Sequence, residues 1–208
     1  MNPENKSRVN ITTITVGHLE TNCYLLHDSK GDAAIIDPGG SPERILMEID
    51  KKICKPRCIL ITHGHSDHIS GIEGVLKAWA VPVLMHRLEI GFLRLPGHRA
   101  RRFHAEALDG TGFLSLEDGD TINISGIPLT ALHTPGHTPG GVCYVMGDVA
   151  FTGDTLFCDG VGRTDFEGGN ERQLLNSIKT KLLTLDDSTR IFPGHGPSSS
   201  IGREKQFF

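Results

Sequence analysis

The segment THGHSDH carries the densest chemistry in this sequence. It places His63, His65, Asp67 and His68 directly after the apolar run 58–61. Side chains alternate in an extended chain, so the imidazoles of His63 and His65 face the same side. Asp67 and His68 follow at the point where the chain turns into a helix. Crowding groups that ionise alike is costly unless something binds them, so this segment predicts a metal site.

Three further candidate ligands follow predicted strands and are flanked by Gly or Pro. His137 lies in TPGHTPG, Asp154 in FTGDTL and His195 in FPGHG. With the first four they form a set of imidazoles and carboxylates, which is the ligand chemistry of Zn²⁺ or iron. Seven ligands are too many for one tetrahedral zinc ion, and they suit two ions that share a carboxylate. The remaining histidines are interpreted as hydrogen-bonded polar residues: His18, His27, His86, His98, His104 and His133.

The elements that must position these residues are strands and helices in both halves of the chain. Strands are predicted over residues 10–16, 22–28, 33–37, 57–61, 82–85, 121–124, 127–133, 141–146, 149–153 and 190–192. Helices are predicted over residues 66–80, 86–95 and 170–184, and another begins at Ser41 and Pro42. The stretch 96–115 is expected to be irregular or weakly helical. The strands between 121 and 153 are short and separated by Gly or Pro turns, which suits antiparallel pairing.

Length and composition bound the class of protein. A chain of 208 residues can bury one substantial core, so residues 1–208 are expected to form a single layered α/β domain. The net charge of −4 argues against broad nucleic-acid binding. Five scattered cysteines, an odd number, suggest no disulfide framework and indicate a reducing compartment. No apolar run approaches the roughly 20 residues that a membrane span needs. We therefore expect a cytoplasmic protein without a nucleic-acid or membrane partner.

Four motifs occur in the order THGHSDH, TPGHTPGG, FTGDTLF and FPGHGP. In this order they resemble the metallo-β-lactamase superfamily, and the resemblance covers nearly the whole chain. It implies an α/β fold with four layers, αββα, in which two mixed β-sheets lie between outer helices and the site lies at one edge. The resemblance also divides the candidate ligands between two ions: His63, His65 and His137 for the first, Asp67, His68 and His195 for the second, and Asp154 as the bridge.

The same resemblance implies roles for two aspartates. Asp37, in IIDPGG, matches a family acid that orients the metal ligands from behind. The alternative is an aspartate that caps the turn after its strand. Asp154 stands where β-lactamases of the superfamily usually carry Cys or Ser, so hydrolysis of lactams is not expected.

Within the superfamily, the segment FTGDTLFCDGVGRTDFEGG is most similar to glyoxalase II-type (hydroxyacylglutathione hydrolase-like) enzymes. This resemblance implies a small thioester substrate, derived from glutathione, and two divalent ions, with zinc expected and iron or manganese as alternatives. Asp67 would orient the hydroxide that bridges the ions and attacks the thioester. Arg163 and Phe166 stand where glyoxalase II has the Lys and Tyr that contact glutathione. The sequence ends at EKQFF, so the C-terminal helical domain of the full-length enzyme is expected to be missing.

Two other functions remain as alternatives. Persulfide dioxygenases share the segment GRTDF and use one iron, but their last histidine usually lies in P-A-H-D-Y. This chain reads PGHGP at that point, which favours the hydrolases. A metal-binding module without turnover, acting in regulation or interaction, belongs to a different class, and a complete ligand set argues against it.

Two arginine-containing segments allow two interpretations each. Arg99, Arg101 and Arg102, in residues 97–106, are interpreted as a solvated face, with a lid that attracts anionic substrates as the alternative. Arg163, in GVGRTDF, is hypothesised to bind a substrate carboxylate through its planar guanidinium. The alternative is an ion pair with Asp165 or Glu167 that stiffens the loop.

Overall fold

Buried apolar side chains form three clusters, and these clusters define the layers of the molecule. The computed structural model describes residues 9–93, 113–124 and 126–208. On strand 21–27, Leu26 faces one cluster and Leu25 faces another, because successive side chains of a strand point to opposite faces. The middle cluster lies between two sheets, and the outer two lie between each sheet and its helices. Both sheets are therefore covered on both faces.

The first sheet has six strands in the order β1-β2-β3-β4-β5-β6. The pairs β1–β2 and β2–β3 are antiparallel, and the pairs from β3 to β6 are parallel, so the sheet is mixed. Its strands are β1 Asn10–Val16, β2 Thr21–His27, β3 Asp32–Ile36, β4 Lys55–Leu60, β5 Val83–His86 and β6 Phe113–Leu116. Parallel neighbours need crossover connections, and helices supply those between β3 and β5.

The second sheet has the order β14-β13-β10-β9-β8-β7 and is also mixed. Only β10 and β13 are parallel, whereas the run β7-β8-β9-β10 is antiparallel, as the sequence predicted. Its strands are β7 Thr121–Ile124, β8 Ile127–His133, β9 Val142–Met146, β10 Val149–Gly153, β13 Arg190–Pro193 and β14 Ser199–Ser200. A separate hairpin consists of β11 Leu156–Phe157 and β12 Gly160–Val161.

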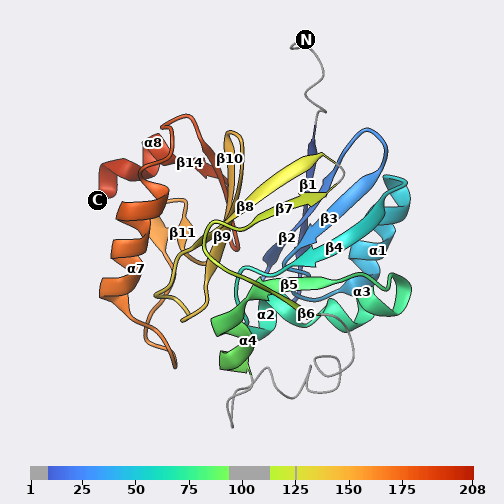
Figure 1. The fold of residues 1–208 in the computed structure, drawn as a ribbon, viewed down its shortest axis with the longest axis horizontal. Helices are drawn as coiled ribbons and strands as arrows, with labels where there is room; N and C mark the ends of the chain where they lie inside the picture. Colours follow the sequence, from blue (N-terminus) through green and yellow to red (C-terminus); the bar gives the residue numbers. More distant parts are fainter. Residues whose placement is uncertain (1–8, 94–112, 125) are drawn as a thin grey trace.

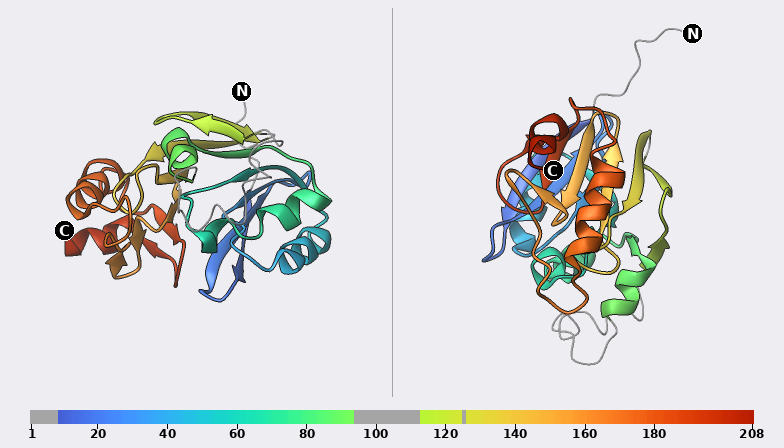
Figure 2. Two further views of the ribbon diagram at one scale, coloured as in Figure 1. Left: turned by 90° about the horizontal axis from the view of Figure 1, so that it is seen from below. Right: turned by 90° about the vertical axis from the view of Figure 1, so that its left-hand side faces the viewer.

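Helices cover the outer face of each sheet (Figures 1 and 2). Ile45 and Ile49 of α1 and Val75 of α3 pack on the first sheet. Leu174 of α7 and Ile201 of α8 pack on the second. The helices are α1 Pro42–Lys51, α2 Ser66–Ile69, α3 Ile72–Ala78, α4 Arg87–Leu93, α7 Glu171–Ser177, the π-helix η1 Ile178–Leu182, α8 Ile201–Glu204 and the 3-10 helix η2 Lys205–Phe207. The expected αββα arrangement of two mixed sheets between helices is confirmed.

Three predicted elements differ from the structure. The helix expected over 66–80 is two helices, because the N–H of Gly71 donates to the carbonyl of Pro38 and the chain turns there. The stretch 96–115 was expected to be irregular or weakly helical, yet β6 begins at Phe113, and its last residue, Leu116, reaches the core between the sheets. The helix expected over 170–184 changes to π geometry after Ser177.

Three further sequence predictions concern the arginine-rich segment, the cysteines and a membrane span. The arginine-rich segment 97–106, with Arg99, Arg101, Arg102, His98 and His104, lies outside the described residues. All five cysteines are free, so no disulfide forms among them. None of the described helices is long and apolar enough to cross a membrane.

Candidate metal centre

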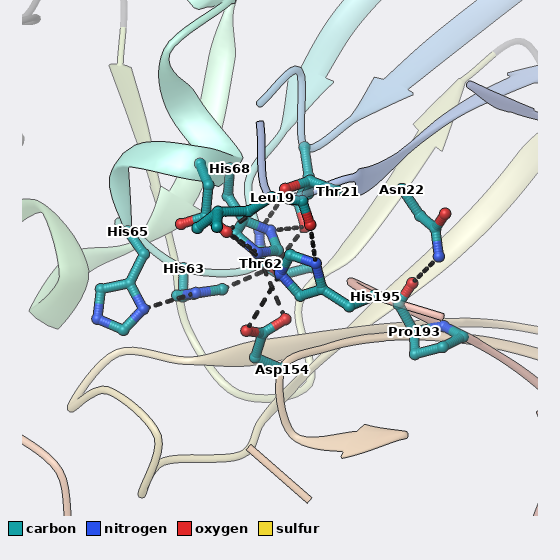
Figure 3. A network of polar contacts seen from close by, with 12 residues as sticks. Leu19, Thr21, Asn22, Thr62, His63, His65, His68, Asp154, Pro193 and His195 are labelled. Atoms are coloured by element: carbon teal, nitrogen blue, oxygen red, sulfur yellow. Dashed lines mark hydrogen bonds and ion pairs between the residues drawn. The ribbon is translucent and has the colours of Figure 1, made fainter. Parts of the chain in front are cut away.

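All seven candidate ligands meet at one edge of the two sheets. Figure 3 shows His63, His65, His68, Asp154 and His195 pointing toward one another. They come from the loop after β4 and helix α2, which follows it directly, and from the loops after β8, β10 and β13. The structure groups them by ligand atoms that lie within 4.8 Å of one another: His63 with His65 and His137, His63 with His68 and Asp154, and Asp67 with His68 and His195. The structure thus brings together the seven side chains that the sequence singled out.

The first group is a cluster of three imidazoles. Nδ1 of His65 lies 3.1 Å from Nε2 of His63 and 2.9 Å from Nε2 of His137. The three rings pack edge to face, with centroids 4.6 to 4.7 Å apart. Lone pairs at this separation repel one another unless a proton or a cation lies between them. One proton can bridge one pair, whereas one cation can serve all three nitrogens.

The second group combines imidazole and carboxylate. Oδ2 of Asp67 lies 3.2 Å from Nε2 of His195 and 3.5 Å from Nε2 of His68. Asp154 lies between the two groups. Its Oδ1 is 3.4 Å from Nε2 of His68, and its Oδ2 is 3.6 Å from Nε2 of His137 and 3.7 Å from Nε2 of His195. Each oxygen of Asp154 thus faces ligand atoms, and Oδ2 faces both groups.

Acceptors outside the cluster fix the tautomers of three imidazoles. Nδ1 of His68 lies 2.9 Å from Oδ2 of Asp37. Nδ1 of His137 lies 2.6 Å from the carbonyl of Arg163, and Nδ1 of His195 lies 3.0 Å from the carbonyl of Leu19. Carbonyl and carboxylate oxygens only accept, so Nδ1 donates in each case. In the neutral rings Nε2 then carries the lone pair, and it points into the cluster.

The fourth imidazole is oriented through a threonine. The hydroxyl of Thr62 donates to Oδ2 of Asp37 at 2.6 Å, so its oxygen is left to accept a proton. Nδ1 of His63 lies 3.1 Å from that oxygen and supplies the proton. Nε2 of His63 is therefore unprotonated and faces the other imidazoles. Asp37 thus orients His68 directly and His63 through Thr62.

Burial keeps the first group neutral. It lowers the pKa of His63, His65 and His137, and in His63 and His65 the neighbouring imidazoles add to the effect. The pKa of His65 falls to about 4. Neutral imidazole is the form that binds a metal ion.

The second group carries charge. Burial alone would lower the pKa of His68, but the carboxylates of Asp154 and Asp37 outweigh burial and raise it well above its usual value. Burial would raise the pKa of Asp67, but the contact with His195 and the charge of His68 hold it below its usual range. Despite burial, the neighbouring imidazoles also lower the pKa of Asp154, so Asp67 and Asp154 stay ionised and attract positive charge, which a divalent ion supplies more fully than protons do.

Two buried atoms test whether metal ions fit here. Among the described residues, only Nε2 of His68 and Oδ1 of Asp154 are buried side-chain atoms without a hydrogen-bond partner. A buried polar atom without a partner costs about 1–3 kcal/mol, and more when it is charged. Both atoms are ligand types for Zn²⁺ or iron, and they face each other at 3.4 Å. The residues present therefore fit a pair of divalent ions.

Arg163 and Phe166 lie at the rim of the cluster. The ring of Phe166 is 44% exposed, and its centroid lies 5.5 Å from that of His65. The guanidinium of Arg163 forms two hydrogen bonds to Asp165, at 2.8 and 3.0 Å, and lies over the Phe166 ring at 4.4 Å. The alternative predicted for Arg163, a pair with Asp165, is therefore present in the structure. His133, by contrast, stacks on His86 and takes no part in the cluster.

Sequence reasoning singled out Asp37, which orients His68, but missed the other groups that orient the imidazoles. Thr62 directly precedes the first histidine, and its position could have suggested a role. The carbonyls of Leu19 and Arg163 carry no signal in the sequence, because every residue has a carbonyl.

Comparison with known proteins extends these observations. Residues 16–195 match the model of a family described as the metallo-beta-lactamase superfamily. Hydroxyacylglutathione hydrolase GloC of Haemophilus influenzae is 38% identical over 206 residues, which cover 95% of this chain and 96% of that protein. The crystal structure of BLEG-1 B3 metallo-beta-lactamase is 33% identical, with a TM-score of 0.84, and the match covers 95% of this chain and 97% of that one. The structure of TTHA1623 in a di-iron-bound form is 33% identical, with a TM-score of 0.79, and covers 94% and 97%.

Replacing Thr62 by Val should selectively lower the affinity for one metal ion, the one that His63 binds. Valine keeps the shape of the side chain but removes the hydroxyl that orients His63. Loss of such an outer partner typically lowers metal affinity about 10–100-fold. Competition with a zinc chelator measures the change, and Thr62→Ser, which keeps the hydroxyl, is the matched control. Equal affinities in the Val and Ser variants would show that the hydroxyl does not orient the ligand.

Replacing Asp154 by Ala should prevent the protein from holding two ions at once, because the carboxylate of Asp154 faces both ligand groups. Elemental analysis after dialysis measures the ions retained per chain. His133→Ala is the control, since His133 is close in sequence to His137 but lies outside the cluster, and it should retain the wild-type content. Two ions at full occupancy in Asp154→Ala, or equal metal loss in the control, would contradict this assignment.

Proposed function

The chain belongs to the metallo-beta-lactamase superfamily, and on that premise we propose that it hydrolyses thioesters with two divalent metal ions. The proposed substrates are small S-acyl thioesters, with hydroxyacylglutathione as the expected class. The family match agrees with the resemblance found in the sequence. The relative named hydroxyacylglutathione hydrolase covers nearly the whole of this chain and supports the choice of class.

One observation carries the proposal: the lone pairs of two ligand groups point at a common space, and Asp154 lies between them. In this proposal each group binds one ion: His63, His65 and His137 the first, Asp67, His68 and His195 the second, with Asp154 shared. Two ions bound there would lower the pKa of a water molecule to near neutrality and polarise the carbonyl of the substrate. The structural relative in its di-iron-bound form supports two ions, and zinc, iron and manganese all suit the ligand set.

Asp67 is proposed to orient the attacking water. The hydroxyl of Thr21 donates to Oδ2 of Asp67 at 3.4 Å, and Nε2 of His195 lies 3.2 Å from the same oxygen. The pKa of Asp67 is held below its usual range, so its carboxylate accepts hydrogen bonds at neutral pH. Its other oxygen can accept a hydrogen bond from the water and align a lone pair with the thioester carbonyl.

The proposed mechanism needs no general acid, because the leaving group is a thiolate. A thiol has a pKa of about 8.5, so the thiolate departs without first being protonated. An amine leaving group would need a proton from a positioned acid. The residues of the cluster offer imidazoles and carboxylates that face each other rather than a free acid. The arrangement therefore suits a thioester better than an amide.

A panel of substrates tests the proposal. The metal-loaded protein is expected to cleave S-D-lactoylglutathione, measured by the loss of thioester absorbance. A β-lactam belongs in the panel because a structural relative is described as a B3 metallo-beta-lactamase. Glutathione persulfide, with oxygen uptake as the readout, tests the dioxygenase alternative. Absence of cleavage for every thioester tested, with the metal content complete, would contradict the proposed function.

Arg163 and Asp165 together test the substrate contact. If Arg163 binds a carboxylate of the substrate, it must exchange Asp165 for that carboxylate. Arg163→Ala should then raise KM several-fold for an anionic thioester and leave kcat intact, because the contact acts on ground state and transition state alike. Asp165→Asn should lower KM, since it removes the competing carboxylate. An uncharged thioester is the control. Equal loss of kcat for both substrates in both variants would mean that the pair only stiffens the loop.

A further inference from the structure

Glu89 is a fully buried carboxylate that the proposed mechanism does not use. It lies on α4, the helix that follows β5. Its Oε1 accepts a hydrogen bond from the backbone N–H of Gly64 at 2.7 Å. Its Oε2 accepts two, from the N–H of Gly140 at 2.9 Å and from the hydroxyl of Thr138 at 2.9 Å. All three donors are neutral.

The three donors belong to two loops that carry candidate ligands. Gly64 lies between His63 and His65, in the loop that leaves β4 of the first sheet. Thr138 directly follows His137, in the loop that leaves β8 of the second sheet. One carboxylate therefore joins the two segments that supply the first ligand group. His65 and His137, which meet in the cluster, are 72 residues apart in the sequence.

Keeping a carboxylate at this position is costly. Burial raises the pKa of Glu89 to about 7, although its three hydrogen bonds oppose the shift. An apolar side chain would avoid the cost of removing the charge from water. Only a carboxylate, however, offers two oxygens that both accept. A glutamine would present its NH₂ group to one of the loops, where an N–H or O–H already points.

The loop that carries Gly140 lies so close to α4 that no side chain fits between them at this position. A Cβ atom on Gly140 would lie 2.3 Å from the backbone nitrogen of Glu89 and 2.7 Å from its Oε2. Real Cβ atoms essentially never come this close to another heavy atom, so the loop can rest on the helix only with glycine there. The contact between loop and helix is thus built into the backbone as well as the side chain.

The second ligand group has different supports. Asp37 holds His68, Thr21 holds Asp67 and the carbonyl of Leu19 holds His195. Other bonds join the sheets near Glu89, from the N–H of Val142 to the carbonyl of Thr62 and from the hydroxyl of Tyr144 to the carbonyl of Ile61. Loss of Glu89 should therefore leave the sheets joined.

We propose that Glu89 is a positioning residue that clamps the two loops, so that His63, His65 and His137 converge before an ion arrives. This inference rests on the proposed dinuclear site and deepens it, because it assigns a separate determinant of affinity to the first ion. A preorganised ligand set binds more tightly, since less ordering accompanies binding. Without the clamp, the three imidazoles are free to separate, and the first ion loses affinity while the second keeps it.

Titration of metal-free protein with Zn²⁺ against a competing chelator tests this directly. Glu89→Gln is the test variant. Glu204→Gln is the matched control, because Glu204 is equally buried and accepts from the N–H of Asp159 and the hydroxyl of Ser199, away from the ligand loops. We expect Glu89→Gln to bind one ion with wild-type affinity and the other about 10–100-fold more weakly. The control should keep both affinities, even where its melting temperature falls as much.

Two results would overturn the proposal. One is a Glu89→Gln variant whose two affinities both equal those of the wild type. The other is a loss that falls on both ions equally and that Glu204→Gln reproduces, which would reduce Glu89 to a stabilising residue. If Glu89→Gln does not fold, Thr138→Val carries the test, since it removes one donor and keeps the carboxylate. It should weaken the same single ion, with Thr138→Ser as control, and an unchanged affinity would overturn the proposal.

The wild-type titration separates this inference from the proposed function. Two ions per chain and thioester cleavage, with no selective loss in the variants, would overturn the clamp alone. Fewer than two ions in the wild type would overturn the dinuclear function, and the clamp with it.

Discussion

The carboxylate of Asp37 is the group on which the geometry of the cluster depends. It is buried and accepts three hydrogen bonds, from the N–H of Thr62, the hydroxyl of Thr62 and Nδ1 of His68. Because a carboxylate can only accept, each bond fixes the position of a proton, and the threonine passes this constraint to His63. In the neutral rings, which are the form that binds a metal ion, the inward nitrogens of both imidazoles carry lone pairs. The orientation of these two imidazoles is therefore set by Asp37 and Thr62, which do not face the space between the ligands.

Other orienting contacts join the two sheets at the edge where the cluster lies. His195 comes from the second sheet, yet the turn after β1 of the first sheet supplies the carbonyl of Leu19 that orients it. Asn22, on β2, donates to the carbonyls of Pro193 and Gly196 on either side of that histidine. Ion binding and the packing of the two sheets are therefore coupled. An ion that binds only the folded chain stabilises it in proportion to its affinity, so metal loss should loosen this edge first.

The sequence predicted the layers and the seven clustered side chains because both depend on local signals. Strand periodicity predicts buried faces, and polar residues at strand ends converge at one edge of a sheet. The orienting groups depend instead on contacts between distant segments. The carbonyls of Leu19 and Arg163 have no residue signature, and Glu89 reads as an ordinary helix residue until the fold buries it. The break between α2 and α3 was missed for the same reason, since it follows from a bond between Gly71 and the distant Pro38.

Anomalous scattering at the zinc edge, from crystals of the zinc-loaded protein, would locate the bound ions. Two peaks are expected about 3.5–4 Å apart, both in contact with Asp154. One should lie among the nitrogens of His63, His65 and His137, and the other should contact Nε2 of His68 and of His195. A single peak, or a peak away from Asp154, would contradict the shared dinuclear site, because the inward lone pairs and the unpartnered atoms of His68 and Asp154 would then have another cause.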